Sequence, residues 1–376
     1  MNRSGGKHFM ASILAISVAV TLMGYVKASA QWEAQWQKTL EAGKKEGKVS
    51  AYVGLLSPAV RKQAPIFTKK FGIELEVTPG RGADLSRKLR TEKTAGLNLA
   101  DVVIAGGNTL YAVKKMGLTE PMENNLILPE VTNPKLWYRL DTLPWFDNDR
   151  HLFRFYAYPN RDISINTDLV KPGELQSWHD LLKPQYKGKI VWSDPTMFGS
   201  GFNGFCSKIL SKVTDENFYR QMVATQQITL SRNLRQMAEW LAKGKYAVAI
   251  SVEGRPITEM LNAGAHIAYA TVKEGTYLSH DAGVLGMVAK APHPNAAKVF
   301  VNWLLSRDGQ DFAQRATRYM SARNDIPTEG IVNPDTMRVP GETYFAAASS
   351  IEKWVMEEQE KYIALAKEIF GPLIGR

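Results

Sequence analysis

The sequence has almost no cysteine and none of the common catalytic motifs. Cys206 is the only cysteine among 376 residues, so no internal disulfide can form, and its apolar surroundings predict an inert thiol on a buried helix face. The six histidines are never spaced to bind zinc, and there is no Gly-x-Ser-x-Gly elbow and no phosphate-binding P-loop. Gly80-x-Gly82 lacks the third glycine of a dinucleotide fingerprint. These absences favour binding over catalysis, and they leave open an enzyme built from scattered carboxylates.

Long uncharged apolar runs are absent after residue 30. Before it, Phe9 to Val26 form an uncharged stretch of 18 residues that follows a short basic segment. Ala28-Ser29-Ala30 then fit a signal-peptidase site, so we expect residues 1–30 to be a signal peptide cleaved before Gln31. An uncleaved membrane anchor is the alternative, because this stretch just reaches the length of a span. No cysteine stands at the cleavage site for lipid attachment, so the sequence predicts a freely diffusing exported protein.

The chain after the predicted signal peptide is too long for one core and suits two compact domains. The whole sequence has a formal net charge of +10, and Arg3, Lys7 and Lys27 of the signal peptide supply three of its positive charges. A mild basic excess can attract an anionic ligand. The basic residues are not gathered in runs, so we expect no nucleic-acid partner.

Short apolar strands alternate along the chain with Gly- or Ser-bearing turns and helices, which is typical of α/β architecture. The helix that begins at Ser57-Pro58 is expected to run toward Gly72, with Pro65 kinking or shortening it. Amphipathic spacing predicts further helices over 296–305 and 344–370. The apolar runs predict strands over 49–53, 73–77, 101–104, 189–192, 246–250 and 283–288.

Five turns that follow predicted strands carry small or hydrogen-bonding residues. In α/β sheets, ligands bind beyond the carboxyl ends of the strands, where helix N-termini offer free N–H groups and a partial positive charge. The same residue types are also ordinary turn and cap residues, which is the competing explanation for each turn taken alone. The five turns are Leu55-Leu56-Ser57, Gly80-Arg81-Gly82, Gly106-Gly107-Asn108, Asp194 to Gly201, and Glu253-Gly254-Arg255.

Segments between about Gly47 and Ile326 are similar to one known family. The most specific run begins at Gly286-Met287-Val288 and continues through Ala291-Pro292-His293-Pro294-Asn295-Ala296-Ala297 to Phe300, Trp303-Leu304-Leu305-Ser306 and Gly309-Gln310. Supporting segments lie at 165–170, 178–182, 186–190 and 237–250. Together they resemble the periplasmic solute-binding proteins of ABC transporters, in the branch that binds ferric iron.

The resemblance implies an α/β fold of two lobes, the type 2 periplasmic-binding-protein fold, with a ligand cleft between them. The first lobe is expected to contain 31–158 and 284–325, and the second lobe 159–283 and 326–376 with a C-terminal helix. Two segments, Phe153 to Ile165 and Thr271 to Val288, are expected to cross between the lobes. The family also implies a monomer that works in the periplasm without a cofactor, closes on its ligand and docks on an ABC permease.

One departure from the iron-binding branch concerns the ligand. Iron-binding members place adjacent tyrosines after the strand that corresponds to 246–250, whereas this chain has Val252-Glu253-Gly254-Arg255 there. Ferric iron prefers hard anionic oxygen ligands such as phenolates, so their loss argues against iron. The planar fork of Arg255 suits a carboxylate or phosphate instead.

The sequence therefore predicts a binding protein for a small organic anion such as a phosphate, phosphonate or carboxylate, with no metal. The first alternative is a ferric iron or iron-chelate binding protein, and the second is a secreted lyase or hydrolase that uses Asp194 and Glu253. Aromatic residues near the turns, either as pocket walls or as core, are Tyr156, Tyr158, Trp192, Phe198 and Phe202. The predicted ligand-binding residues are Leu56, Ser57, Arg81, Gly82, Gly106, Asn108, Arg161, Asp194, Ser200, Arg232, Glu253 and Arg255.

Overall fold

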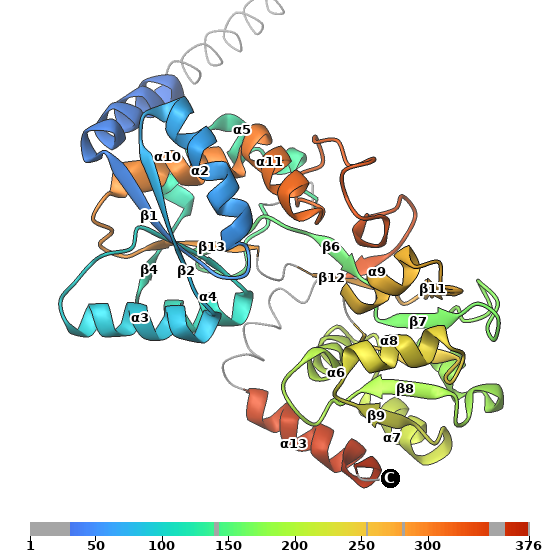
Figure 1. Ribbon diagram of the computed structural model, residues 1–376. Helices are drawn as coiled ribbons and strands as arrows, with labels where there is room; N and C mark the ends of the chain where they lie inside the picture. Colours follow the sequence, from blue (N-terminus) through green and yellow to red (C-terminus); the bar gives the residue numbers. More distant parts are fainter. Residues whose placement is uncertain (1–30, 139–142, 253–254, 280–282, 346–357, 375–376) are drawn as a thin grey trace, which may run out of the picture.

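The computed structural model describes residues 31–138, 143–252, 255–279, 283–345 and 358–374. The predicted signal peptide lies outside these residues. Two α/β lobes, each built around its own sheet, are joined by a small third sheet (Figure 1). The predicted two-lobed α/β architecture is confirmed.

The first lobe contains a six-stranded sheet in the order β2-β1-β3-β13-β4, with β5 also paired to β13. The first three strands of the chain are parallel, and β13 runs antiparallel to β3. The strands are β1 (Lys48–Val53), β2 (Glu74–Pro79), β3 (Val102–Ala105), β4 (Thr119–Glu120), β5 (Leu152–Arg154) and β13 (Val284–Val288).

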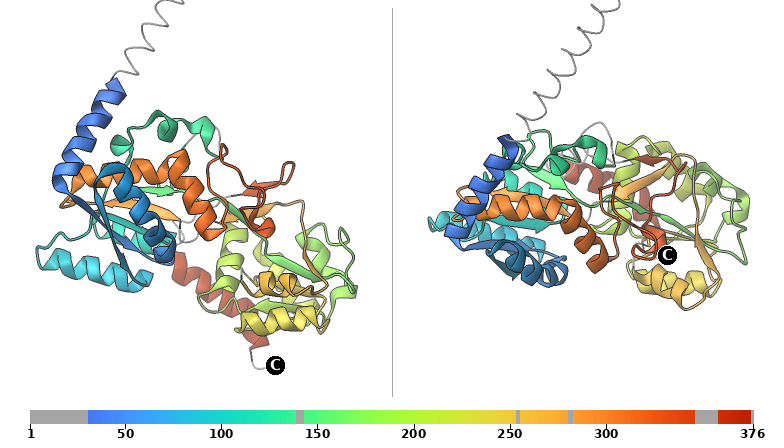
Figure 2. Two further views of the ribbon diagram at one scale, coloured as in Figure 1. Left: turned by 45° about the horizontal axis from the view of Figure 1, so that its top comes forward. Right: turned by 90° about the horizontal axis from the view of Figure 1, so that it is seen from above.

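Helices cover both faces of this sheet (Figures 1 and 2). Alternate residues of a strand point to opposite faces, so Val53 packs with Phe67 and Phe300 while Tyr52 packs with Leu110. The helices of the first lobe span 31–46, α2 (Ser57–Phe71), α3 (Gly82–Thr94), α4 (Gly107–Lys115), the short α5 (Pro129–Thr132), α10 (Pro294–Leu305) and α11 (Arg307–Thr317).

The second lobe has a five-stranded sheet in the order β11-β7-β10-β8-β9. Its strands are β7 (Ile163–Asn166), β8 (Ile190–Ser193), β9 (Thr229–Ser231), β10 (Val248–Ile250) and β11 (Ile267–Tyr269). Its helices are α6 (Ser200–Leu210), α7 (Glu216–Thr225), α8 (Leu234–Ala242), α9 (Arg255–Asn262) and α13 (Gln359–Phe370). Short 3-10 helices lie at Glu123–Asn125, Pro134–Leu136, Trp178–Leu182, Pro184–Tyr186, Pro334–Thr336 and Gly371–Leu373.

The C-terminal helix α13 belongs to the second lobe. Phe370 packs edge-on against Trp192 and Phe205, and its ring lies 5.9 Å from that of Tyr219. Cys206 is fully buried on the neighbouring helix α6, as expected for an inert thiol. This packing ties the end of the chain to the core of the second sheet.

The two lobes are connected through a three-stranded sheet of β6 (Tyr158–Asn160), β12 (Thr276–Ser279) and β14 (Tyr344–Phe345), which we call the hinge sheet. Strands β6 and β12 lie within the two segments that were expected to cross between the lobes. Strand β14 is parallel to β12. The chain therefore passes through this region three times.

Two local expectations differ from the structure. Helix α2 runs without interruption through Pro65, and Gly72 ends it with a left-handed φ of 70°. The segment expected to be a helix from residue 344 begins instead with β14 and ends with the helix α13, and residues 346–357 lie outside the described residues. Residues 326–345, placed by sequence in the second lobe, contact both predicted lobes, because Arg338 donates to Ala157 and Ser321 while Glu342 pairs with Arg161.

Candidate ligand-binding site

Strand register places the predicted turns of both lobes on the side of their sheets that faces the hinge sheet. In the first lobe, Ala105 at the end of β3 lies opposite Val284, the first residue of β13, which follows the hinge strand β12. In the second lobe, Ile250 at the end of β10 lies opposite Ile163, which follows the hinge strand β6. The carboxyl ends of the parallel strands in each lobe therefore lie nearest the hinge, where a ligand of a two-lobed α/β protein binds.

Three helices of the first lobe begin at this edge without a side-chain cap. Leu56 precedes α2, Arg81 precedes α3 and Gly106 precedes α4, and none of the three accepts or donates a capping hydrogen bond through its side chain. Uncapped helix N-termini carry free N–H groups and a partial positive charge, which together suit an anion. The edge thus supplies anion-binding capacity from the backbone.

Two of these helix starts lie in contact. A Cβ atom on Gly82 would stand 2.1 Å from Oγ1 of Thr109, so the beginning of α3 requires glycine to pack against the beginning of α4. By contrast, a Cβ atom on Gly106 would meet nothing within 4 Å. Arg81 and Asn108 are exposed beside these starts. The space in front of α4 is therefore open, with polar side chains at its border.

The first turn, after β1, places its residues differently from the prediction. Leu56 is buried in the core, and Ser57 is half-buried with its N–H donated to the carbonyl oxygen of Gly54. Leu55, which sequence reasoning did not select, is 76% exposed. In the second lobe, Phe198 of the turn after β8 is also exposed, at 62%. Leu55 and Phe198 are both exposed just after the end of a strand. Each lobe therefore has one apolar side chain that can contact a ligand.

The turn after β8 is held by Asp194. Its Oδ1 accepts hydrogen bonds from the backbone N–H and the hydroxyl of Thr196, and its Oδ2 accepts one from Nε of Arg232 at 2.8 Å. Burial raises the pKa of Asp194, but the hydrogen bonds from Thr196 and Arg232 outweigh it, so the pKa lies below its ordinary value. Asp194 is an ionised structural anchor, which makes it a poor general acid at neutral pH.

Helix α6 begins tightly against the end of β8. A Cβ atom on Gly201 would stand 2.0 Å from the carbonyl oxygen of Ser193, so only glycine fits there. Ser200, the first residue of the helix, places its hydroxyl 3.1 Å from that of Ser193. No side chain caps this helix, so it presents a fourth free N-terminus on the hinge side.

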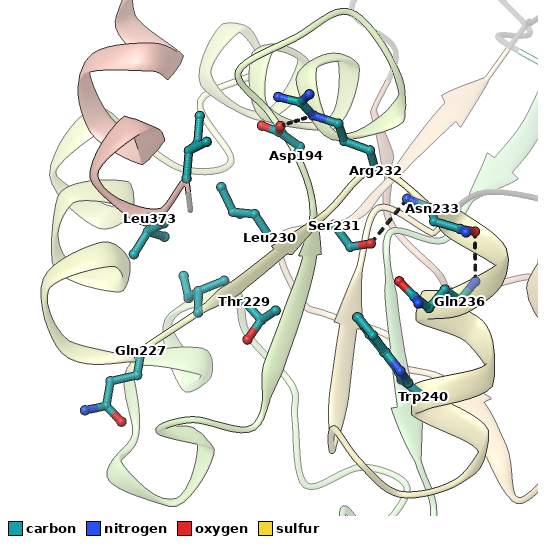
Figure 3. A pocket seen from close by; sticks show the side chains of 12 residues that line it. Asp194, Gln227, Thr229, Leu230, Ser231, Arg232, Asn233, Gln236, Trp240 and Leu373 are labelled. Carbon is teal, nitrogen blue, oxygen red and sulfur yellow. Dashed lines mark hydrogen bonds and ion pairs between the residues drawn. The ribbon is translucent and has the colours of Figure 1, made fainter. Parts of the chain in front are cut away.

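A pocket of about 740 Å³ opens beside the edge strand β9 (Figure 3). Asp194 and Arg232 lie at one end of it and Trp240 of α8 lies at the other, with Thr229 and Ser231 between them. Asn233 caps α8 by accepting a hydrogen bond from the N–H of Gln236. The pocket joins two of the predicted ligand residues to a polar and aromatic lining.

The turn after β10 carries backbone strain. Ser251 is fully buried with a φ of 56°, a left-handed conformation that is unfavourable for serine and is frequent at functional sites. Its N–H donates to the carbonyl oxygen of Asp162 at 2.7 Å, and its hydroxyl bonds to the carboxylate of Asp162, which also pairs with the buried Lys208. Glu253 lies outside the described residues, as does the side chain of Arg255, whose backbone begins α9.

Arg161 forms a structural ion pair. Nη1 and Nη2 of Arg161 donate to the two carboxylate oxygens of Glu342 at 2.7 and 2.9 Å, and both side chains are at least nine-tenths buried. Because this bidentate pair occupies its fork, Arg161 is held within the hinge region and is not available as a ligand contact.

The aromatic residues near the turns divide into core and surface. Tyr156, Trp192 and Phe202 are buried core residues, which bears out the core alternative for these three. Tyr158 is half-buried and stacks on Tyr319 with 4.7 Å between ring centroids. Phe198 is thus the most exposed of the five.

Among the described residues, no group of three His, Cys, Asp or Glu side chains is placed to hold a metal ion. No helix in the described part of the chain is long and apolar enough to cross a membrane. The groups described at the hinge-side edge include backbone N–H groups, hydroxyls, amides and guanidinium groups, which bind anions and polar oxygens, while the carboxylate of Asp194 is engaged by Thr196 and Arg232.

Comparison with known proteins agrees with this arrangement. Residues 62–337 match the family of bacterial extracellular solute-binding proteins. The chain belongs to this family. Its members bind solutes, which confirms the prediction of a binding protein over an enzyme. An uncharacterised protein of Haemophilus influenzae is 24% identical over 197 residues, a match that covers 48% of this chain and 54% of that relative.

Solved structures of solute-binding proteins share the fold at low sequence identity. FutA (IdiA) of Trichodesmium, with iron and citrate, has a TM-score of 0.67 and 17% identity, covering 86% of this chain and 99% of that chain. The periplasmic binding protein AfuA of Actinobacillus pleuropneumoniae, with fructose 6-phosphate, has a TM-score of 0.56 and 18% identity, covering 88% and 99%. HitA of Pseudomonas aeruginosa, with iron, has a TM-score of 0.56 and 17% identity, covering 86% and 99%.

Proposed function

We propose that this solute-binding protein is the periplasmic component of an ABC importer and captures a small organic anion for delivery to the permease. The observation that carries the proposal is the convergence of four uncapped helix N-termini on the hinge side of the two sheets. Each offers N–H groups and a partial positive charge, and lobe closure places them around one ligand. The relatives' ligands that carry carboxylate or phosphate groups, citrate and fructose 6-phosphate, support this ligand class.

The mechanism requires only binding and closure. An anionic group accepts hydrogen bonds from the helix N-termini of one lobe, and the hinge sheet bends until the other lobe contacts the same ligand. Leu55 and Phe198 then cover apolar parts of the solute. Binding energy comes from charge-assisted hydrogen bonds in a site from which water is excluded, and the solute is released unchanged.

A ferric or iron-chelate ligand is the second candidate, because FutA and HitA contain iron. Against a bare ferric ion stands the lack of adjacent tyrosines after β10, where this chain has Val252-Glu253-Gly254-Arg255. A chelate such as ferric citrate would instead be held through its carboxylates.

A thermal-shift screen separates the candidates. The probes are inorganic phosphate, sugar phosphates, phosphonates, citrate and ferric citrate. A ligand that binds only the folded protein and is present at 100 times its Kd stabilises the folded state by about 2.7 kcal/mol. This raises the melting midpoint by several degrees. We expect such a shift with one class of anion. No response to any anion, together with tight ferric binding and a visible charge-transfer band, would overturn the proposal.

A further inference from the structure

Arg154 lies on the same edge of the first sheet as the helix N-termini. Strand β13 pairs with β3 on one side and with β5 on the other, so that Val284 stands opposite both Ala105 and Arg154. Neighbouring strands are about 4.8 Å apart, so the backbone of Arg154 is about 10 Å from that of Ala105. Ala105 leads directly into Gly106 and α4. Arg154 is therefore a cation at the hinge-side edge, two strands from a free helix N-terminus.

The charge of Arg154 is not balanced by any described residue. The residue is 3% exposed, and within the described ranges its side chain makes one hydrogen bond, from Nη2 to the carbonyl oxygen of Trp145 at 2.9 Å. Its Nε is buried without a hydrogen-bond partner. Burying a cation without a counter-charge is unfavourable, and proteins ordinarily pair such groups. The position and the unused donor point to a negative group that arrives with a ligand.

A second arginine without a carboxylate partner, Arg338, lies nearby, but its Nη1 and Nη2 groups are engaged, because they also donate to the carbonyl oxygens of Ala157 and Arg323. Nη1 of Arg338 donates to the carbonyl oxygen of Ser321, and Nη2 donates to Oδ1 of Asn324. No carboxylate of the described chain lies within ion-pair distance of Arg338. Burial lowers the pKa of Arg338 to about 10, which reports the same lack of a counter-charge.

Tyr138 links the two arginines. The guanidinium carbons of Arg154 and Arg338 lie 6.0 and 5.9 Å from the centre of its ring. Tyr138 and Arg338 are both half-buried, so the cluster reaches the surface. The nearby Arg323 shows the usual solution for a buried arginine, because Asp325 pairs with it at 2.8 Å through two hydrogen bonds.

We infer that Arg154, with Tyr138 and the positive charge of Arg338 beside it, forms a subsite for an anionic group of the solute, either a phosphate or a carboxylate. The inference rests on the proposed function and deepens it, since it adds a guanidinium subsite to the backbone N–H groups of α4. The planar fork of arginine binds either group bidentately. A solute long enough to reach α4 and Arg154 together carries anionic or polar oxygen groups at two separated positions.

The test compares Arg154→Gln with the wild type in thermal-shift and calorimetric titrations with inorganic phosphate and with citrate. The matched control is Arg235→Gln, which removes an exposed arginine from α8. We expect the wild type and the control to bind one of the two probes, and Arg154→Gln to bind it at least tenfold more weakly. A response to phosphate alone assigns a phosphate subsite, and a response to citrate alone assigns a carboxylate subsite.

The melting midpoint without ligand supplies an independent readout. Because Arg154→Gln removes an unbalanced buried charge, we expect its ligand-free midpoint to equal or exceed that of the wild type. A variant that binds the probe as tightly as the wild type overturns the inference, and so does a lower ligand-free midpoint with unchanged affinity. If the wild type binds no anion, the proposed function fails, and a lowered ligand-free midpoint then overturns this inference as well.

Discussion

At the scale of single residues, Asp194 shows how one carboxylate organises a turn. It bonds to the N–H and hydroxyl of Thr196 and to the side chain of Arg232, although these groups come from two different segments. Its ionised state is maintained because these bonds outweigh the effect of burial on its pKa. The sequence predicted that Asp194 contacts the ligand. Because its carboxylate holds the turn, such a contact is possible only at the rim of the pocket in Figure 3.

The substitution Asp194→Asn is expected to destabilise the protein by about 1.5–3 kcal/mol at pH 7, the usual value of hydrogen bonds to a charged group. The folded-state pKa of Asp194 is depressed, so its contribution is present above the unfolded value of about 3.9 and is lost as the pH falls through the folded value. Denaturant unfolding of wild type and variant at pH 7 and below pH 4 measures this. A difference that stays constant across that range would contradict the assignment, and Arg232→Gln, at an exposed position, should cost less.

At this scale, the sequence indicated which residue types suit an anionic ligand, but it did not show which side chains are already bonded to another part of the protein. Arg161 was selected because arginine suits an anion, yet its carboxylate partner Glu342 lies 181 positions away, and no local pattern reveals it. Similarly, the turn after β1 was found from its sequence, but the choice between Leu55 and Leu56 depends on which side of the backbone faces the core.

At the scale of elements, glycine has two different roles where helices begin at the hinge-side edge. Gly201 allows α6 to pack closely against the end of β8, whereas Gly106 leaves space in front of α4. Sequence alone shows a glycine in each turn. It does not show which one is required by packing and which one leaves room for a ligand, because that depends on neighbouring strands and helices.

Alanine substitutions distinguish these uses. Gly201→Ala is expected to destabilise by about 1–3 kcal/mol or more, because its Cβ atom would overlap the backbone of Ser193. Gly106→Ala should cost less than about 1 kcal/mol yet weaken anion binding, because its methyl group covers the N-terminus of α4. Denaturant unfolding and anion titration of both variants measure the contrast. Gly371→Ala, at another open position, is the control and should change neither quantity; equal anion affinity in Gly106→Ala would show that the ligand does not approach α4.

At the scale of the whole molecule, the hinge region is fixed by buried charge as well as by strand pairing. Glu342 accepts both hydrogen bonds of Arg161 and a third from Thr276 of β12. Burial raises the pKa of Glu342, and the bonds from Arg161, Tyr344 and Thr276 outweigh it, so its pKa lies below the ordinary value. The two lobes are therefore joined by an ionised cluster that lies between hinge strands.

The substitution Glu342→Gln is expected to destabilise the whole molecule by about 3–5 kcal/mol, because it removes the carboxylate from a buried arginine. The exposed pair of Lys70 and Asp308 provides the matched control, and Asp308→Asn should cost at most about 1 kcal/mol. Calorimetric unfolding of both variants measures the difference. Equal midpoints in the two variants would show that the hinge cluster contributes no more than a surface pair.

The two-lobed architecture could be predicted from the sequence, since the alternation of strands and helices and the run from Gly286 to Gln310 both indicated it. The path of residues 326–345 could not, because this segment has little periodicity and its bonds are made to distant residues of the first lobe and the hinge. The path of this segment is set by long-range hydrogen bonds, and such bonds produce no periodic pattern in the sequence.

The position of β13 within the first sheet has a consequence for the order in which the lobes can fold during synthesis. All five strands of the second lobe lie between residues 163 and 269, so that sheet is complete in one continuous stretch of chain. The first sheet has β13 between β3 and β5, so its N-terminal strands keep an unpaired edge until residue 288 has been made. The sheet that begins first on the ribosome is thus completed second, because its long-range strand pairing needs a segment made after the whole second sheet.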